Sequence, residues 1–177
     1  MDGFDLKLLR ALQDNGGLTN NQLAERIGLS ASQCSRRRAA LEERGVIAGY
    51  RAVLSPEAIG LDVLVFIRVG LATQSPDSGA AFVALIAGIE EIQEAYSLTG
   101  DADFLLKMAV PDLKTMSHLL NDVLLPHRSV AHVHSYVVLD RVKETARLPL
   151  RYVEGDGQRE AKPRAGAPAA GRSHRVR

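Results

Sequence analysis

The chain has 177 residues, of which 46% are hydrophobic, and a formal net charge of +1. This length accommodates a small domain and a medium-sized one, with enough residues to bury a core. No apolar run is long enough to span a membrane, and the single cysteine, Cys34, excludes a disulfide within the chain. No hydrophobic leader follows the acidic start Met1-Asp2, so we expect a cytoplasmic protein.

The nearly neutral net charge hides an uneven distribution along the sequence. Residues 1–53 contain eight Lys or Arg and six Asp or Glu (+2), residues 54–150 seven and twelve (−5), and residues 151–177 seven and three (+4). Positive charge at both ends favours a polyanionic partner there, whereas the acidic middle needs another role. The modest charge of the first segment indicates that several copies bind together to reach a useful affinity for nucleic acid.

Two consecutive capped helices are predicted in the first part of the chain. Thr19 precedes Gln22 by three positions, and Ser30 precedes Gln33 by the same spacing. This is the spacing of a capping box, in which each side chain of the pair bonds to the other residue's backbone N–H. Gly28 lies between the two helices, where the chain must turn sharply.

The second of these helices, which starts at Ser30 and ends at Gly45, has the side chains that a major-groove recognition helix needs. Polar side chains near its N-terminus can contact base edges, and its arginines can bind phosphates. The alternative is a helical hairpin with a solvated basic face, but the connection is short and the run Arg36–Arg38 contains no acid. We therefore predict a helix-turn-helix DNA-binding domain over residues 1–50. Its candidate DNA-binding residues are Thr19, Asn20, Ser30, Ser32, Gln33, Ser35, Arg36 and Arg37.

A linker over residues 51–61 is expected to join this domain to the rest of the chain. Small or polar residues alternate with larger ones over residues 48–54, which predicts a strand. Ser55-Pro56-Glu57 then begins a short helical turn toward Gly60.

Residues 62–142 alternate between strand and helix periodicity. Strands are expected over residues 63–71, 92–98, 104–110 and 130–139, and helices are expected to start at Pro76 and Asp112. The order strand, helix, strand, strand, helix, strand predicts a ferredoxin-like domain, so the expected fold class is α+β. The helices of such a domain cover one face of the sheet, and the simplest cover for the other face is a second copy of the chain.

The composition changes again after Pro149. Residues 150–177 are rich in Gly, Ala, Pro and Arg and contain few large apolar side chains. Such a segment cannot bury enough apolar surface to fold, so we expect a disordered basic tail. Non-specific contact with DNA and a passive extension are both compatible with this composition.

Taken together, these motifs resemble the Lrp/AsnC family of prokaryotic transcription factors. The resemblance extends from Met1 to about Val142 and rests on LAERIGLS (residues 23–30), GVIAGYRAVL (45–54) and TGDADFLL (99–106), which occur in the order and spacing of the family. Two positions differ from the family pattern. Gly17 stands where members usually have arginine, and Arg38 stands where an apolar residue is usual. Arg38 must therefore either lay its stem along the core or mark a rotated helix.

The resemblance implies a regulator that binds double-stranded promoter DNA and responds to a small-molecule effector, an amino acid. It also implies a homodimer, with pairing of the 48–54 strand between subunits, and four dimers in a ring as a larger state. In the family the segment matching residues 99–104 lines the effector pocket, which residues near the end of the last strand complete. By position these would include His134 and Ser135.

Apart from the family resemblance, the segment TGDADF (residues 99–104) is the most specific candidate for a small-molecule binding site in the sequence. Gly100 permits a tight turn, and Asp101 and Asp103 place two carboxylates near backbone donors. The carboxylates can hold an ammonium group while main-chain N–H groups bind a carboxylate. An ordinary hairpin turn is the alternative. The candidate effector-binding residues are Thr99, Gly100, Asp101, Asp103, His134 and Ser135.

The sequence predicts no metal site, no cofactor and no enzymatic activity. His132 and His134 lie on one face of the last expected strand, but no cysteine or clear third ligand accompanies them, which favours interface or surface histidines. Sirohaem decarboxylases share this two-part architecture, so an enzyme on the same scaffold is the alternative function. Such an enzyme would need a tetrapyrrole pocket lined by basic residues and histidines near the domain junction. Residues 48–60 contain one basic residue, Arg51, and no histidine. A sensing module without DNA binding is disfavoured by the intact surface from Gln33 to Arg37.

Overall fold

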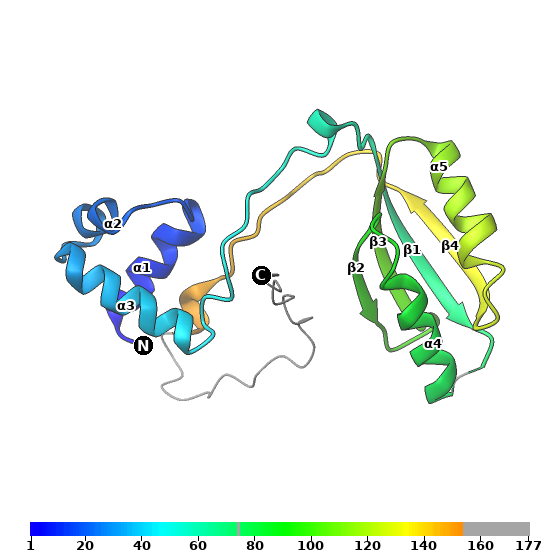
Figure 1. The fold of residues 1–177 in the computed structure, drawn as a ribbon, viewed down its shortest axis with the longest axis horizontal. Coiled ribbons are helices and arrows are strands. Elements are labelled where there is room, and N and C mark those ends of the chain that lie inside the picture. Colours follow the sequence, from blue (N-terminus) through cyan, green and yellow to red (C-terminus); the bar gives the residue numbers. More distant parts are fainter. Residues whose placement is uncertain (74, 154–177) are drawn as a thin grey trace, which may run out of the picture. The chain divides into compact units, whose positions relative to one another are not determined.

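The computed structural model describes residues 1–73 and 75–153. Residues 1–52 and 145–153 belong to one compact unit, and residues 53–144 form a second one (Figure 1). In the described part of the chain, no helix is both long and apolar enough to cross a membrane. The expected disordered tail, residues 150–177, lies outside the described residues from 154 onward, whereas its first residues, Leu150–Tyr152, form an ordered 3₁₀ turn.

Three helices form the N-terminal unit: α1 (Gly3–Asp14), α2 (Asn20–Ile27) and α3 (Ala31–Glu43). Both predicted capping boxes are present at the starts of α2 and α3. Gly28, at φ 76°, turns the chain between these two helices in the left-handed conformation that glycine tolerates best. The predicted helix-turn-helix is therefore confirmed. A shared core of α1, α2 and α3 includes the buried side chains of Leu8, Leu23, Cys34 and Leu41.

The first of these helices, α1, was not identified from the sequence. Asp2 caps it by accepting from the backbone N–H of Asp5, and the Asp5 side chain accepts from the backbone of Asp2 in return. Its buried side chains recur at helical spacing and include Leu8, Leu9 and Leu12. The carboxylate pair at the start of the chain was thus a readable capping signal.

The linker has no strand within this single chain. Residues 48–55 belong to no helix or strand, and the first regular element after α3 is the 3₁₀ turn η1 (Glu57–Ile59). A strand needs a neighbour to accept and donate its backbone hydrogen bonds, and the sheet of the second unit does not include this segment. The predicted strand over residues 48–54 is accordingly an extended segment here.

The second unit contains an antiparallel sheet of four strands in the order β2-β3-β1-β4 within the described residues. The strands are β1 (Val63–Leu71), β2 (Ile92–Ser97), β3 (Phe104–Val110) and β4 (Val130–Val137). The helices are α4 (Pro76–Ile86) and α5 (Leu113–His118), and α5 continues as a π-helical stretch, Leu119–Leu124. Strand order and connections confirm the ferredoxin-like α+β domain predicted from the sequence.

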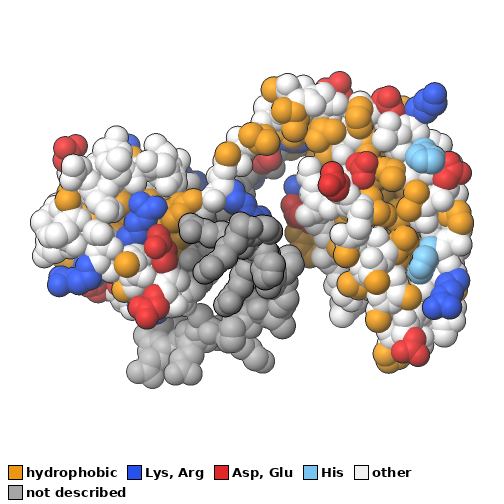
Figure 2. Space-filling model, in the orientation of Figure 1, with side chains coloured by type: hydrophobic (Ala, Val, Ile, Leu, Met, Phe, Trp, Pro, Cys, Tyr) orange, Lys and Arg blue, Asp and Glu red, His pale blue; other side chains and the backbone are white. Residues whose placement is uncertain are grey.

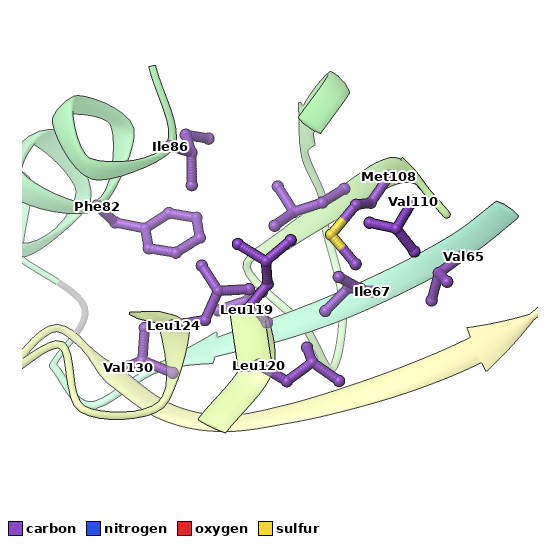
Figure 3. Packing of buried hydrophobic residues seen from close by; sticks show 12 residues of the cluster. Val65, Ile67, Phe82, Ile86, Met108, Val110, Leu119, Leu120, Leu124 and Val130 are labelled. Carbon is purple, nitrogen blue, oxygen red and sulfur yellow. The ribbon is translucent and has the colours of Figure 1, made fainter. Parts of the chain in front are cut away.

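Both helices of this unit pack on the same face of the sheet. Figure 3 shows Phe82 of α4 and Leu124 of the π-helical stretch pointing toward the strands, where Ile67 and Met108 lie. Phe82, Ile67 and Met108 are fully buried, and Phe82 also stacks at a tilt against Phe104 with ring centroids 4.9 Å apart. This packing buries β1 and β3 against the helices, and the turn between β2 and β3 connects two paired strands of the same sheet.

No helix among the described residues of this unit covers the opposite face of the sheet, called the open face below. Because side chains alternate along a strand, the strand register places on it Phe66 and Arg68 of β1, Lys107 of β3, and His134 and Tyr136 of β4. Tyr136 and Tyr96 of β2 are about half exposed. The unit also has exposed apolar side chains near η1 and in the segment after β4, and Figure 2 shows hydrophobic side chains at the surface around η1.

The segment after β4 returns to the N-terminal unit and binds α1. The side-chain amide of Gln13 bonds to both backbone groups of Leu148, with its Nε2 donating to the carbonyl oxygen (3.3 Å) and its Oε1 accepting from the N–H (2.5 Å). Arg147 pairs with Asp14 at 2.8 Å, and Leu150 packs against the core of the three helices. Residues 145–152, which end in the 3₁₀ turn η3 (Leu150–Tyr152), are called the return strap below.

Candidate DNA-binding surface and effector pocket

The capping boxes determine what the polar side chains at the start of α2 and α3 can do. Ser30 Oγ accepts from the backbone N–H of Gln33 (3.2 Å), while Gln33 Oε1 accepts from the backbone N–H of Ser30 (2.9 Å). Thr19 and Gln22 repeat this arrangement on α2. Thr19, Ser30 and Gln33 are therefore engaged in capping, although all three are exposed and keep free hydrogen-bonding capacity.

The next residues of α3 present an exposed polar surface. Ser32, Ser35 and Arg36 are exposed, and no ion pair or hydrogen bond to the described residues restrains the guanidinium of Arg36. Asn20, on α2, is half-buried, and its Oδ1 atom is buried without a hydrogen-bond partner in the described structure. The structure thus places Ser32, Ser35 and Arg36 together on the first two turns of α3, as a groove-binding helix requires.

Arg37 points to a different environment from Arg36. Its guanidinium pairs with Asp5 at 2.7 Å and with Asp2 at 2.8 Å, so it ties α3 to the start of α1. The bonds to Asp5 and then Asp2 raise the pKa of Arg37 further above its usual value. The geometry therefore supports a function of Arg37 in fastening α3 to its own domain, besides the DNA contact that the sequence predicts.

Arg38, the second departure from the family pattern, lies over the aromatic ring of Tyr50. Its guanidinium carbon is 4.3 Å from the ring centroid, and its Nε atom donates to Tyr50 Oη (2.8 Å) and to Glu42 (3.1 Å). Tyr50 Oη also donates to Glu42, and the bonds from Tyr50 and Arg38 lower the pKa of that carboxyl. The helix is not rotated, because Cys34 and Leu41 stay buried on the same face. Arg38 instead joins Tyr50, which directly precedes the linker, to α3.

The turn between β2 and β3 borders a cavity of about 270 Å³ on the open face. Arg68 forms an ion pair with Asp101 and donates through Nη1 to Tyr136 Oη at 3.5 Å. The hydrogen bond from Arg68 lowers the pKa of Asp101. The residues that line the cavity are Arg68, Asp101, Ala102, His132, His134 and Tyr136. A guanidinium beside a carboxylate provides a partner for each charged group of a zwitterion.

Asp103, two residues further along the turn, has a structural function. Its Oδ2 atom accepts from the backbone N–H of Leu71 at 2.7 Å, and its own N–H donates to the carbonyl of Val69 at 2.9 Å. Asp103 and Gly100 border a separate cavity of about 430 Å³, together with Leu71, Ser75, Ser97, Leu98 and Phe104. The two aspartates therefore serve different cavities, and Thr99 is exposed in the turn and lines neither of them.

Of the two candidates on β4, only His134 lines the cavity with Asp101. His134 lies opposite Arg68 on the open face, whereas Ser135 lies opposite Ile67 on the face that the helices cover. Adjacent residues of a strand point to opposite faces, so a single cavity on one face cannot contain both side chains. The strand period alone predicts this separation once His134 is assigned to the site.

Four lining residues were missing from the sequence-based site: Arg68, Ala102, His132 and Tyr136. Arg68 and Tyr136 are far from the turn in sequence, and only the strand register brings them beside Asp101. The ring of His132 lies directly over Gly70, where an added Cβ would collide with the imidazole. His132 and His134 meet edge to face with ring centroids 5.4 Å apart. In the described residues, no group of three or more His, Cys, Asp or Glu is arranged to hold a metal.

Comparison with known proteins connects both surfaces to one family. A model of winged helix-turn-helix DNA-binding domains matches residues 1–48, and the Lrp/AsnC ligand binding domain matches residues 64–148. The chain is 40% identical over 151 residues to the leucine-responsive regulatory protein of Haemophilus influenzae, a match that covers 85% of this chain and 91% of that protein. The chain belongs to the Lrp/AsnC family.

Solved structures of Lrp/AsnC regulators have the same fold as this chain. A transcriptional regulator from Neisseria meningitidis in complex with L-Met is 39% identical, with a TM-score of 0.84 over 86% of this chain and 99% of that one. An AsnC family regulator from Agrobacterium tumefaciens is 33% identical, with a TM-score of 0.80 over 86% of this chain and 99% of that one. The relatives are named as transcription regulators, which supports regulation and does not support the sirohaem decarboxylase alternative.

Proposed function

We propose that this Lrp/AsnC regulator binds promoter DNA through α3 and changes its DNA affinity when an amino acid occupies the cavity beside Asp101. The observation that supports DNA binding most directly is the exposed group of Ser32, Ser35 and Arg36 on the first two turns of α3. Arg36 has no intramolecular partner among the described residues, so its charge is available to a phosphate or a guanine edge. The proposal includes no catalytic step.

The pairing of Arg68 with Asp101 supports an amino-acid effector. The α-carboxylate of the ligand would bind the guanidinium of Arg68, and its ammonium group would bind the carboxylate of Asp101. The relative from Neisseria meningitidis was crystallised with L-Met, so amino-acid binding has a precedent on this fold. Here the ligand would exchange one internal ion pair for two ligand-mediated ones.

We further propose that a second copy of the chain covers the open face. Phe66 and the half-exposed rings of Tyr96 and Tyr136 give this face an apolar surface, and a covering copy would remove it from water. The effector cavity borders the same face, so occupancy of the cavity and association of two copies would affect each other. Four such dimers in a ring, an octamer, would be a further assembly state.

The DNA fragments that co-purify with the protein from its source cells test this function. The full-length protein should retain a limited set of fragments, and the set or its amount should change when amino acids are added to the lysate. Arg36→Ala should lose most of the retained DNA. Retention of DNA without sequence preference, unaffected by any amino acid, would contradict the proposal.

A further inference from the structure

The amino-acid cavity has a composition that distinguishes between effector side chains. Arg68 and Asp101 account for the two charged groups that all α-amino acids share. The remaining lining residues are His132, His134, Tyr136 and Ala102. Among the described lining residues there is no leucine, isoleucine, valine, methionine or phenylalanine, so an aliphatic effector side chain would find little apolar surface there.

Hydrogen-bond donors dominate this second part of the cavity. Each imidazole has an N–H group, the phenol of Tyr136 has an O–H group, and Arg68 already donates to that phenol oxygen. An aliphatic ligand would cover these donors without satisfying them, which costs binding free energy. A ligand side chain that ends in acceptor oxygens would instead complete their hydrogen bonds.

The two histidines also favour a negative charge on the ligand. Their rings are 5.4 Å apart, and the charged groups that face them are Arg68 from β1 and Asp101 from the β2–β3 turn, with Tyr136 as the neighbour on β4. A carboxylate can accept a hydrogen bond from each imidazole N–H and is attracted by the guanidinium of Arg68, whereas a cationic side chain would be repelled by that guanidinium. An anionic ligand side chain is thus expected to bind at this end of the cavity.

We propose that the effector of this regulator is an acidic amino acid, whose side-chain carboxylate binds His132 and His134. This inference rests on the proposed amino-acid response and adds the class of the side chain. Gly70 takes part by leaving room for the imidazole of His132, which lies over it. The geometry assigns specificity to β4 and the binding of the shared amino-acid groups to Arg68 and Asp101.

Isothermal titration of the full-length protein with L-glutamate, L-aspartate, L-glutamine, L-leucine and L-methionine tests the proposal. An acidic amino acid should bind at least about tenfold more tightly than leucine or methionine, because only it satisfies the cavity donors. Its affinity should also exceed that of L-glutamine, because the amide lacks the negative charge that the guanidinium of Arg68 favours.

Variants that keep an aromatic ring test whether the imidazole of His134 contributes hydrogen bonds to the ligand or only fills space in the cavity. His134→Phe should weaken acidic-ligand binding by about tenfold or more, because a charged hydrogen bond is lost. His118→Phe makes the same chemical change on α5, where His118 pairs with Asp122 away from the cavity, and should bind the ligand like the parent protein. Gly70→Ala should reduce acidic-ligand affinity because the added methyl group displaces the imidazole of His132 without removing it.

Different outcomes distinguish this inference from the proposed function. Binding of leucine or methionine that depends on Asp101 but not on His134 would overturn the acidic side chain and leave the amino-acid response intact. Binding of glutamine as tight as that of glutamate would also overturn it. Failure of every amino acid to bind a protein that still binds DNA would overturn both the inference and the amino-acid response.

Discussion

Arg36, Arg37 and Arg38 are consecutive in the sequence but have three different environments. Arg36 is exposed and unrestrained among the described residues, Arg37 pairs with two carboxylates of α1, and Arg38 stacks on Tyr50. The sequence predicts a basic run on α3. It does not show which of the three arginines is free to bind DNA, because the carboxylates that pair with Arg37 and the ring on which Arg38 stacks lie outside α3. Arg68 was missed for the same reason, since only the register of β1 against β4 brings it into the cavity.

Alanine substitutions should separate the first two of these arginines. Arg36→Ala should weaken DNA binding across sequences and make the salt dependence shallower by about one unit of slope, because one phosphate contact is lost. Its melting temperature should stay at the parent value. Arg37→Ala should lower the melting temperature, since Asp2 and Asp5 lose their shared partner. Fluorescence anisotropy over a salt series and thermal denaturation measure the two effects, and an Arg36→Ala protein with parental affinity and slope would refute the DNA contact.

The two aspartates of the β2–β3 turn should also respond differently to substitution. Asp101→Asn keeps the size of the side chain but removes the charge that pairs with Arg68, so amino-acid affinity should fall by about tenfold or more with little change in melting temperature. Asp103→Ala removes the acceptor for the Leu71 N–H and should lower the melting temperature. Titration calorimetry and thermal denaturation of both variants check this pair. Equal stability losses with unchanged binding would make Asp101 a structural residue too.

At the scale of elements, the sequence predicted the helices and strands whose formation depends on residues close together in the chain. The capping boxes of α2 and α3 and the periodicity of the four strands were all readable, because each depends on residues a few positions apart. The missed α1 had the same kind of signal in Asp2 and Asp5. The return strap was not predictable, because its contacts join Gln13 to Leu148 across most of the chain and involve backbone groups that every sequence has.

The return strap should stabilise the N-terminal unit. Gln13→Ala removes both hydrogen bonds to Leu148, and we expect it to reduce the free energy of unfolding by about 1 kcal/mol. Leu150→Ala should also reduce the free energy of unfolding, because the side chain loses its packing on the core of the three helices. Asn21→Ala removes a carboxamide from the exposed surface of α2, so it is the matched control and should not destabilise the protein. Chemical denaturation measures all three, and a neutral Gln13→Ala would show that the strap does not contribute to stability.

At the scale of the whole molecule, the chain divides into a helical unit with a DNA-binding motif and an α+β unit with a cavity and an open face. The uneven charge of the sequence agrees with this division, since residues 1–53 have an excess of basic residues and residues 54–150 an excess of acidic ones. Fold class and domain order were therefore predictable from periodicity and composition. The contacts within one chain do not show which molecule covers the open face, so the second copy of the chain there stays a prediction.

A charge on the open face should dissociate the proposed dimer. Phe66→Lys would bury an unpaired ammonium group opposite Lys107 if a second copy covers that face, which is costly. Light scattering of the full-length protein at micromolar concentration should show a dimer or larger assembly for the parent chain and a smaller species for the variant. Val83→Lys, at a half-exposed position of α4, serves as the control and should assemble like the parent. A folded parent monomer would contradict the proposed cover of the open face.

The link between the cavity and DNA binding is tested most directly by the DNA affinity of the full-length protein, measured on a co-purified fragment with and without the amino-acid effector. We expect the effector to change the affinity of the parent protein by about 5- to 150-fold, the usual range of allosteric coupling. Asp101→Asn should bind the same DNA with parental affinity and lose most of that change at the same effector concentration. An effector that leaves DNA affinity unchanged in the parent protein, or changes it equally in Asp101→Asn, would contradict this link.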